Sequence, residues 1–142
     1  MHSERLTMDV WHRSLELPCT ARSVYRAREF VGTVLVERGR AELILDARAI
    51  ASELSTNAIV HARCDFTLGL LAHAGHVVVS VFDGSDLLPV RRTPSASATG
   101  GRGLLLIEAF SGAWGVQQHA DGGKTVWARL RAVDGQAVAR HG

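Results

Sequence analysis

The chain has 142 residues, 46% of them apolar and 21% charged, a composition typical of one globular domain that buries a core without disulfides or metals. Its formal charge of +2 comes from 16 basic and 14 acidic residues spread along the chain, so no direct nucleic-acid partner is predicted. No apolar run could cross a bilayer and the first residues lack a signal-peptide core, which predicts a cytoplasmic protein without a membrane partner. Cys19 and Cys64 are therefore expected to be reduced.

The first half of the chain predicts one strand and two helices. Residues 13–17 alternate weakly between polar and apolar side chains and form the strand. The first helix spans about residues 21–37, with Thr20 as its N-cap and Gly39 at its end. The second helix spans about residues 41–62. Its predicted buried stripe consists of Leu43, Ala47, Ile50, Ala51, Leu54 and Ala58.

The second half of the chain predicts two hairpins. Residues 66–71 and 77–82 are apolar, partly β-branched runs joined by a short turn that contains glycine. Residues 113–119 and 124–130 form the other hairpin around a pair of glycines. Each pair of strands is expected to be antiparallel because its connection is short.

The segment between the two hairpins has a different composition. Residues 84–101 contain two prolines, paired arginines and many small residues, which predicts a long loop of the kind that acts as a functional lid. Gly101-Arg102-Gly103 then opens a short helix over residues 104–110, whose first turn presents unpaired backbone N–H groups.

The order of these elements predicts an α+β fold. It is a two-layer α/β sandwich with the helices on one face of a mixed, mainly antiparallel sheet. The predicted domain covers residues 13–131, and residues 1–12 and 132–142 are expected to be disordered tails.

Glu53 and Asn57 lie at the edge of the buried stripe of the second helix, one turn apart. A carboxylate in that place is suited to orient an attacking hydroxyl or water, and an amide oxygen is a suitable ligand for Mg²⁺. From this stretch alone, an ordinary solvated helix edge remains the simpler explanation. His61, on the stripe side of the same helix, is expected to be packed and hydrogen-bonded rather than catalytic.

Two other patterns resemble known sites but lack their spacing. Gly123-Lys124-Thr125 ends like a P-loop, yet the first glycine of that motif would fall on Gln118. His73 and His76 are spaced like metal ligands, but no second pair accompanies them, so they are interpreted as solvated turn residues.

The remaining polar and glycine features occur in a fixed order that resembles the Bergerat-fold ATPases and kinases, the superfamily of the histidine kinases. Within it, the chain is most similar to the small anti-sigma-factor serine/threonine kinases of Gram-positive bacteria, in particular the single-domain actinobacterial type. The matching segments are Glu53-Leu54-Ser55-Thr56-Asn57-Ala58 with His61-Ala62, Val81-Phe82-Asp83-Gly84-Ser85, Gly101-Arg102-Gly103-Leu104-Leu105-Leu106, Trp114-Gly115-Val116, and Gly122-Gly123-Lys124-Thr125-Val126-Trp127.

The resemblance implies a role for each candidate residue in binding ATP and Mg²⁺. Asn57 would hold the metal, and Glu53 would be the catalytic base. Asp83 would accept a hydrogen bond from the adenine amino group, assisted by the hydroxyl of Thr125. The phosphates would lie on the residues that open the predicted short helix, namely Gly101, Arg102, Gly103 and Leu104. Taken singly, Asp83 also fits a turn cap and the glycines a plain helix entry.

The function implied by the resemblance is an ATP- and Mg²⁺-dependent serine/threonine protein kinase that acts as an anti-sigma factor. It would bind a sigma factor in one state and phosphorylate an anti-sigma-factor antagonist in another, and so regulate transcription by partner switching. Two alternatives stay open: a nucleotide-binding interaction module without kinase activity, and a bare ATPase. The sequence also leaves open whether the chain forms a homodimer.

Overall fold

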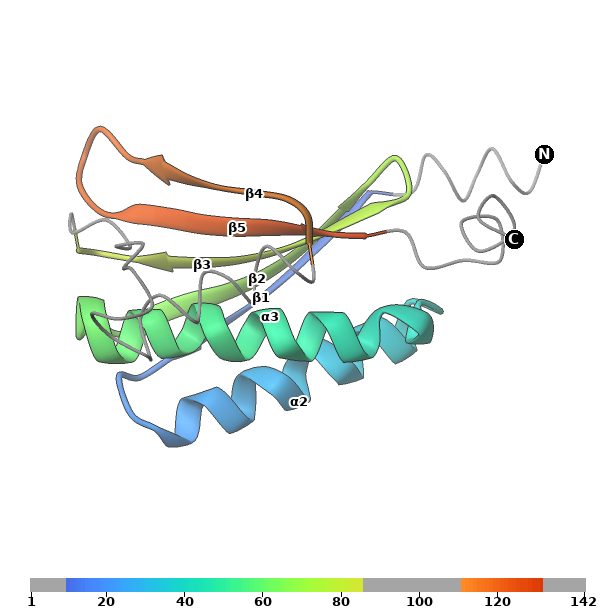
Figure 1. The fold of residues 1–142 in the computed structure, drawn as a ribbon, viewed down its shortest axis with the longest axis horizontal. Helices are drawn as coiled ribbons and strands as arrows, with labels where there is room; N and C mark the ends of the chain where they lie inside the picture. Colours follow the sequence, from blue (N-terminus) through green and yellow to red (C-terminus); the bar gives the residue numbers. More distant parts are fainter. Residues whose placement is uncertain (1–9, 86–110, 132–142) are drawn as a thin grey trace, which may run out of the picture.

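A five-stranded sheet carries two helices on one of its faces in the computed structural model, which describes residues 10–85 and 111–131 (Figure 1). In chain order the described elements are β1 (Trp11–Leu17), α2 (Arg22–Glu37), the 3₁₀ turn η1 (Ala41–Leu43), α3 (Ile44–Thr56), the π-helix η2 (Asn57–Ala62), β2 (Phe66–His73), β3 (His76–Asp83), β4 (Ser111–Gln118) and β5 (Lys124–Leu130). The strand order is β1-β2-β3-β5-β4, and all four neighbouring pairs are antiparallel. The predicted α+β sandwich is confirmed. The predicted helix over residues 104–110 and nearly all of the predicted lid lie outside the described residues, as do both predicted tails except for residues 10–12.

The core lies between the helices and one face of the sheet. Alternate residues of the central strand β3 are buried on this face, as the period of two in a strand requires. The predicted stripe of the second helix is confirmed, since all six of its residues are at most 2% exposed. The side chains that α2 adds to the same core are Ala27, Val31, Val34 and Leu35.

The first helix begins and ends by different means. Its N-cap is Ala21 and no side chain caps it, so the prediction that Thr20 caps this helix is wrong. The Thr20 hydroxyl lies 3.3 Å from the Ser23 hydroxyl instead, and Ser23 donates to the Pro18 carbonyl at 2.7 Å. At the other end, Gly39 has a φ of +72° and Arg40 N–H donates to the Leu35 carbonyl, which is the hydrogen bond of a Schellman motif. The predicted end is therefore confirmed.

The second helical segment is divided into three pieces rather than being one continuous α-helix. The 3₁₀ turn η1 leads into α3, and the backbone then widens to the π-helix η2 at Asn57. Within residues 10–85 and 111–131, no helix is both long and apolar enough to cross a membrane.

Both predicted hairpins are present. In the first, Ala74 and Gly75 form a two-residue turn with φ of 53° and 84°, the pair of positive φ angles that suits the twist of a hairpin. His73 and His76 flank this turn and are exposed, as interpreted from the sequence.

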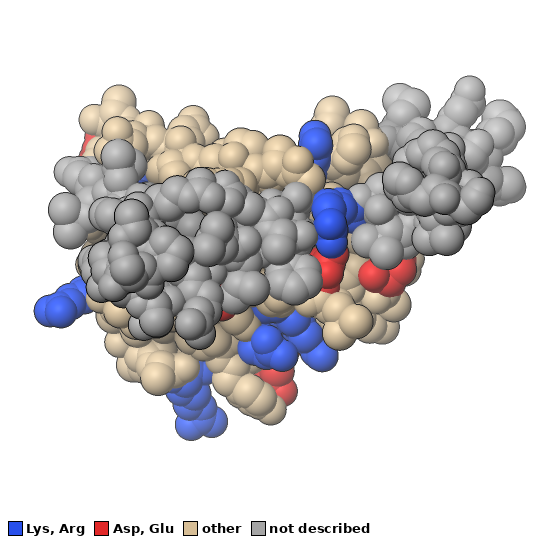
Figure 2. Space-filling model, viewed as in Figure 1, with Lys and Arg blue, Asp and Glu red and all other residues tan. Residues whose placement is uncertain are grey.

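Figure 2 shows the surface charges of the described residues on one face of the molecule. Basic and acidic side chains lie interspersed there.

Candidate functional site

Glu53 lies in the last turns of α3, the helix that packs across β3 and β5. The residue is half-buried, as expected at the edge of the buried stripe. Desolvation by this burial raises the pKa of the Glu53 carboxyl above its ordinary value of 4.5. A carboxyl with a raised pKa accepts a proton more readily near neutral pH than an exposed glutamate does.

The raised pKa predicts a dependence of stability on pH. Because the pKa of Glu53 is higher in the folded state than in the unfolded chain, its contribution is most favourable below pH 4.5 and is lost as the pH rises through the folded-state pKa. Glu53→Gln is therefore expected to gain in stability relative to the wild type as the pH rises above 4.5. Urea unfolding at several pH values measures this difference. A difference that stays constant over the range would contradict a desolvated carboxyl.

Asn57 begins the π-helix η2, one turn beyond Glu53. Its Nδ2 atom is buried and has no hydrogen-bond partner in the part of the chain that the structure describes. A buried polar atom without a partner costs about 1–3 kcal/mol, so such atoms usually have a structural or functional explanation. Single turns of π-helix are also frequent at functional sites. The two observations together make Asn57 a ligand-binding candidate.

The π-helix also explains where His61 lies. The Cys64 N–H donates to the Ala58 carbonyl at 3.3 Å, and Arg63 ends the segment with a φ of 55°. His61 is exposed, so the prediction of a packed histidine is wrong. The wider turn changes the angular position of the residues after Asn57, and a stripe extrapolated with 3.6 residues per turn fails there.

Asp83, at the end of β3, is buried and forms an ion pair with Lys124 at the start of β5. The Lys124 Nζ atom lies 2.9 Å and 3.0 Å from the two carboxylate oxygens of Asp83. The Lys124 side chain is only 4% exposed and the Asp83 side chain 3%. The Ser85 N–H also donates to Asp83 Oδ1, at 2.9 Å. The sequence analysis missed Lys124, because the lysine was considered only as part of an unsuccessful P-loop match.

Gly123 allows β5 to start close to the end of β3. Its φ is +85°, and a Cβ atom there would lie 2.6 Å from the Asp83 carbonyl oxygen and 3.1 Å from the Phe82 ring. Any side chain would force the strands apart at the position where Lys124 meets Asp83. The glycine therefore fixes the geometry of the ion pair.

The structure does not bring Thr125 to Asp83. Thr125 is paired with Phe82, and Asp83 with Lys124, so Thr125 lies on the opposite face of the sheet from the carboxylate. Its hydroxyl lies 2.7 Å from His119 Nε2, and the His119 ring packs edge-on against Phe82. The predicted assistance of Thr125 in base recognition has no support in this register.

The predicted phosphate-binding residues are not part of the described structure. Gly101, Arg102, Gly103 and Leu104 all lie between residues 86 and 110, which are outside it. The elements that carry Glu53, Asn57 and Asp83 meet at one end of the molecule: η2 contacts β3, and the end of β3 lies at the same end as η2 and the start of β5 (Figure 1).

A hollow of about 330 Å³ lies beside this end, near the ends of β1 and β3 and the start of β2. The sequence analysis did not predict it, because its lining combines residues from separate strands and loops. It is not lined by Glu53 or Asn57, but it reaches Phe82, next to Asp83. The lining residues are Glu16, Leu17, Pro18, Asp65, Phe66, Thr67 and Phe82.

At Asn57, the residues present fit the Mg²⁺ of a bound nucleotide. The buried amide nitrogen of Asn57 has no hydrogen-bond partner among the described residues, and the oxygen and nitrogen of an amide can exchange places by a flip. Mg²⁺ is commonly bound through one or two protein oxygens, with substrate phosphates and water as the other ligands. At the base end, Asp83 is a buried acceptor, but it is already engaged by Lys124.

An antiparallel sheet with two helices on one face agrees with the two-layer sandwich expected of a histidine kinase-like ATPase. The chain belongs to the histidine kinase-like ATPase domain family, whose model matches residues 17–130. The resemblance to the Bergerat-fold superfamily is thereby confirmed. A comparison with curated protein sequences finds no match.

Among solved structures, the chain is similar to the crystal structure of the RsbU and RsbW domains of Rv1364c from Mycobacterium tuberculosis. The TM-score is 0.63 and the sequence identity 21%, so this similarity concerns the fold. The match covers 85% of this chain and 32% of the other, and the chain therefore spans about a third of the length of that protein.

Proposed function

We propose that this chain is an ATP- and Mg²⁺-dependent serine/threonine protein kinase that acts as an anti-sigma factor. Family membership supports the use of ATP. The observation that carries the kinase assignment is the pairing of Glu53, half-buried and with a raised pKa, with Asn57, whose buried amide nitrogen has no partner among the described residues. A module that only binds nucleotide has no need for a base beside the metal ligand.

Each residue would have a separate task in this reaction. Bound Mg²⁺-ATP would supply the phosphoryl group together with a cation that neutralises its charge. Asn57 would hold the metal through its amide oxygen, and Glu53 would accept the proton of a serine or threonine hydroxyl. Asp83 would bind the adenine amino group. The raised pKa of Glu53 improves proton transfer, because it brings the base closer to the working pH.

The proposed partners are a sigma factor and a small antagonist protein that is the phosphoryl acceptor. The sequence resemblance to anti-sigma-factor kinases supports them, and the solved RsbW domain of similar fold agrees with that resemblance. A protein that switches between these partners would work in the cytoplasm and regulate transcription. The alternative is a nucleotide-binding module without transfer, since family membership supports nucleotide binding and the same fold hosts different functions.

The decisive experiment uses the natural acceptor. A small protein that binds the full chain in the presence of ADP or ATP is isolated from the same cells and incubated with the chain and γ-labelled ATP. Label on a serine or threonine of that protein supports the kinase. Tight binding with intact ATP and an unlabelled partner contradicts the kinase and favours the binding module.

Asn57→Ala is expected to weaken the binding of Mg²⁺-ATP by at least about tenfold, because it removes the one protein ligand proposed for the metal. Isothermal titration calorimetry with and without Mg²⁺ measures the loss. Ser52→Ala is the matched control: Ser52 lies on the same helix but accepts a hydrogen bond from Arg28 of α2 at 2.9 Å. Equal loss in both variants, or loss in neither, would remove Asn57 from the site.

A further inference from the structure

Within the part of the chain that the structure describes, the Lys124–Asp83 ion pair leaves hydrogen-bonding capacity unused. An ammonium group has three N–H donors, and Lys124 directs two contacts to Asp83, at 2.9 Å and 3.0 Å. An ionised carboxylate has about four lone-pair positions, and three are used by Lys124 and by the N–H of Ser85. Among the hydrogen bonds of residues 10–85 and 111–131, one N–H of Lys124 Nζ and one lone pair of the Asp83 carboxylate therefore remain unused, on atoms that lie about 3 Å apart.

This remaining pair is an acceptor beside a donor, which is the complement of the amino edge of adenine. The exocyclic amino group of adenine donates, and the ring nitrogens on either side of it, N1 and N7, accept. Guanine placed in the same orientation would bring its O6 carbonyl against the carboxylate of Asp83, where two acceptors repel each other. Because the Lys124 ammonium is charged, its hydrogen bond to a ring nitrogen would be stronger than one from a neutral hydroxyl.

We propose that Lys124 is a base-recognition residue, which donates a hydrogen bond to the adenine ring nitrogen next to the amino group that Asp83 accepts. The inference rests on the proposed nucleotide binding and adds to it a specificity-determining residue. It also gives a role to the Gly123-Lys124-Thr125 segment. Gly123 keeps the start of β5 close to β3, and the register places Lys124, rather than Thr125, across from Asp83.

The first test changes the ligand and leaves the protein intact. Calorimetry compares the affinity of the wild-type chain for ATP, 1-deaza-ATP, 7-deaza-ATP and GTP, all with Mg²⁺. One of the two deaza analogues is expected to bind on the order of 10- to 100-fold more weakly than ATP, because it lacks the acceptor for a charged donor. GTP is expected to bind more weakly than ATP. Equal binding of ATP and both deaza analogues overturns the proposal.

The second test assigns the lost hydrogen bond to Lys124. Lys124→Met is expected to bind ATP as weakly as the wild type binds the deaza analogue that lost affinity. The same variant is expected to bind that analogue with no further loss of affinity. Since this variant leaves Asp83 unpaired, the double variant Asp83→Asn, Lys124→Met serves if the single one does not fold, and it too is expected to bind ATP and the analogue equally. A preference for ATP that persists in these variants overturns the proposal.

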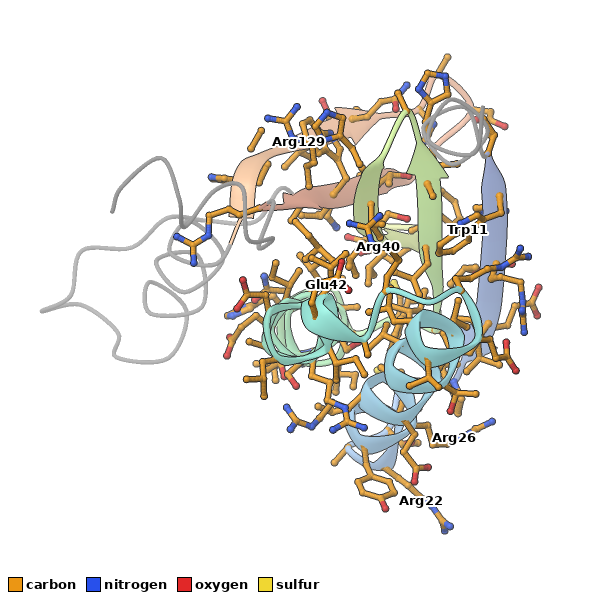
Figure 3. All side chains as sticks on the ribbon, turned by 90° about the vertical axis from the view of Figure 1, so that its right-hand side faces the viewer. Trp11, Arg22, Arg26, Arg40, Glu42 and Arg129 are labelled. Carbon is orange, nitrogen blue, oxygen red and sulfur yellow. The ribbon has the colours of Figure 1, made fainter. Side chains whose placement is uncertain are left out.

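Arg129→Met is the matched control. Arg129 lies on the same strand as Lys124, on the side of the sheet away from the helices (Figure 3), and its substitution is expected to keep the wild-type ratio of affinities. A ratio that changes as much in Arg129→Met overturns the assignment to Lys124. A wild-type chain that binds no ATP contradicts the proposed function itself, whereas ATP binding without preference between ATP and the deaza analogues contradicts only the role of Lys124.

Discussion

Lys124→Met is expected to lower the free energy of unfolding by about 3–5 kcal/mol, the usual cost of removing one partner from a buried ion pair. The Asp83 carboxylate is 3% exposed and would lose both contacts with the ammonium. Only the N–H of Ser85 would still compensate its charge among the partners that the structure describes. Urea denaturation, with a check that the m-value is unchanged, measures the effect.

Two further variants separate the charge effect from loss of packing. Asp83→Asn, Lys124→Met removes both charges and is expected to recover most of the stability, because a buried pair replaced by neutral groups of similar size is often close to neutral. Arg13→Met breaks an exposed pair with Glu37, at 3.1 Å, and is expected to cost at most about 1 kcal/mol. If Lys124→Met costs no more than Arg13→Met, the Lys124–Asp83 pair is not buried in solution.

The parts of the fold that sequence could predict depend on local chemistry. Gly39 ends α2 because a positive φ suits glycine, and the turn at Gly75 follows the same logic. The stripe that contains Ile50 and Leu54 is buried because its spacing matches the period of a helix. Each of these features is decided within a few residues, and each was predicted.

The parts that sequence could not predict depend on distant contacts. Asp83 and Lys124 are 41 residues apart, and only the register of β3 with β5 brings them together. A shift of one residue would turn Thr125 toward Asp83 and Lys124 away from it. The sequence did contain one usable signal, since Lys124 has the same alternation as Val126 and Ala128, which are buried. A lysine at that position is therefore on the core face.

The π-helix is a second feature without a local signal. The apolar stripe of the second helix continues to Ala58, so the pattern gives no indication that the backbone widens at Asn57. The prediction that Glu53 and Asn57 share one edge still stands, because they are one turn apart where the widening begins. The misplacement of His61 shows where extrapolation beyond that point fails.

Glu53→Gln is expected to lower phosphoryl transfer to the acceptor protein by about 10²–10⁴-fold, the contribution typical of a positioned general base. Glutamine keeps the size of the side chain but cannot accept the hydroxyl proton. Because Glu53 is proposed to contact neither the base nor the metal, the affinity for Mg²⁺-ATP is expected to stay close to that of the wild type. Single-turnover transfer with labelled ATP and calorimetry give the two values separately.

The comparison with Asn57→Ala distinguishes a base from a binding residue. If the two residues have the proposed tasks, Asn57→Ala loses binding and transfer together, whereas Glu53→Gln loses transfer alone. Glu29→Gln, on the exposed face of α2, controls for the removal of a carboxylate and is expected to behave like the wild type. Transfer by Glu53→Gln at the wild-type rate would exclude Glu53 as the base. Loss of ATP binding in the same variant would instead place its carboxylate in the nucleotide site.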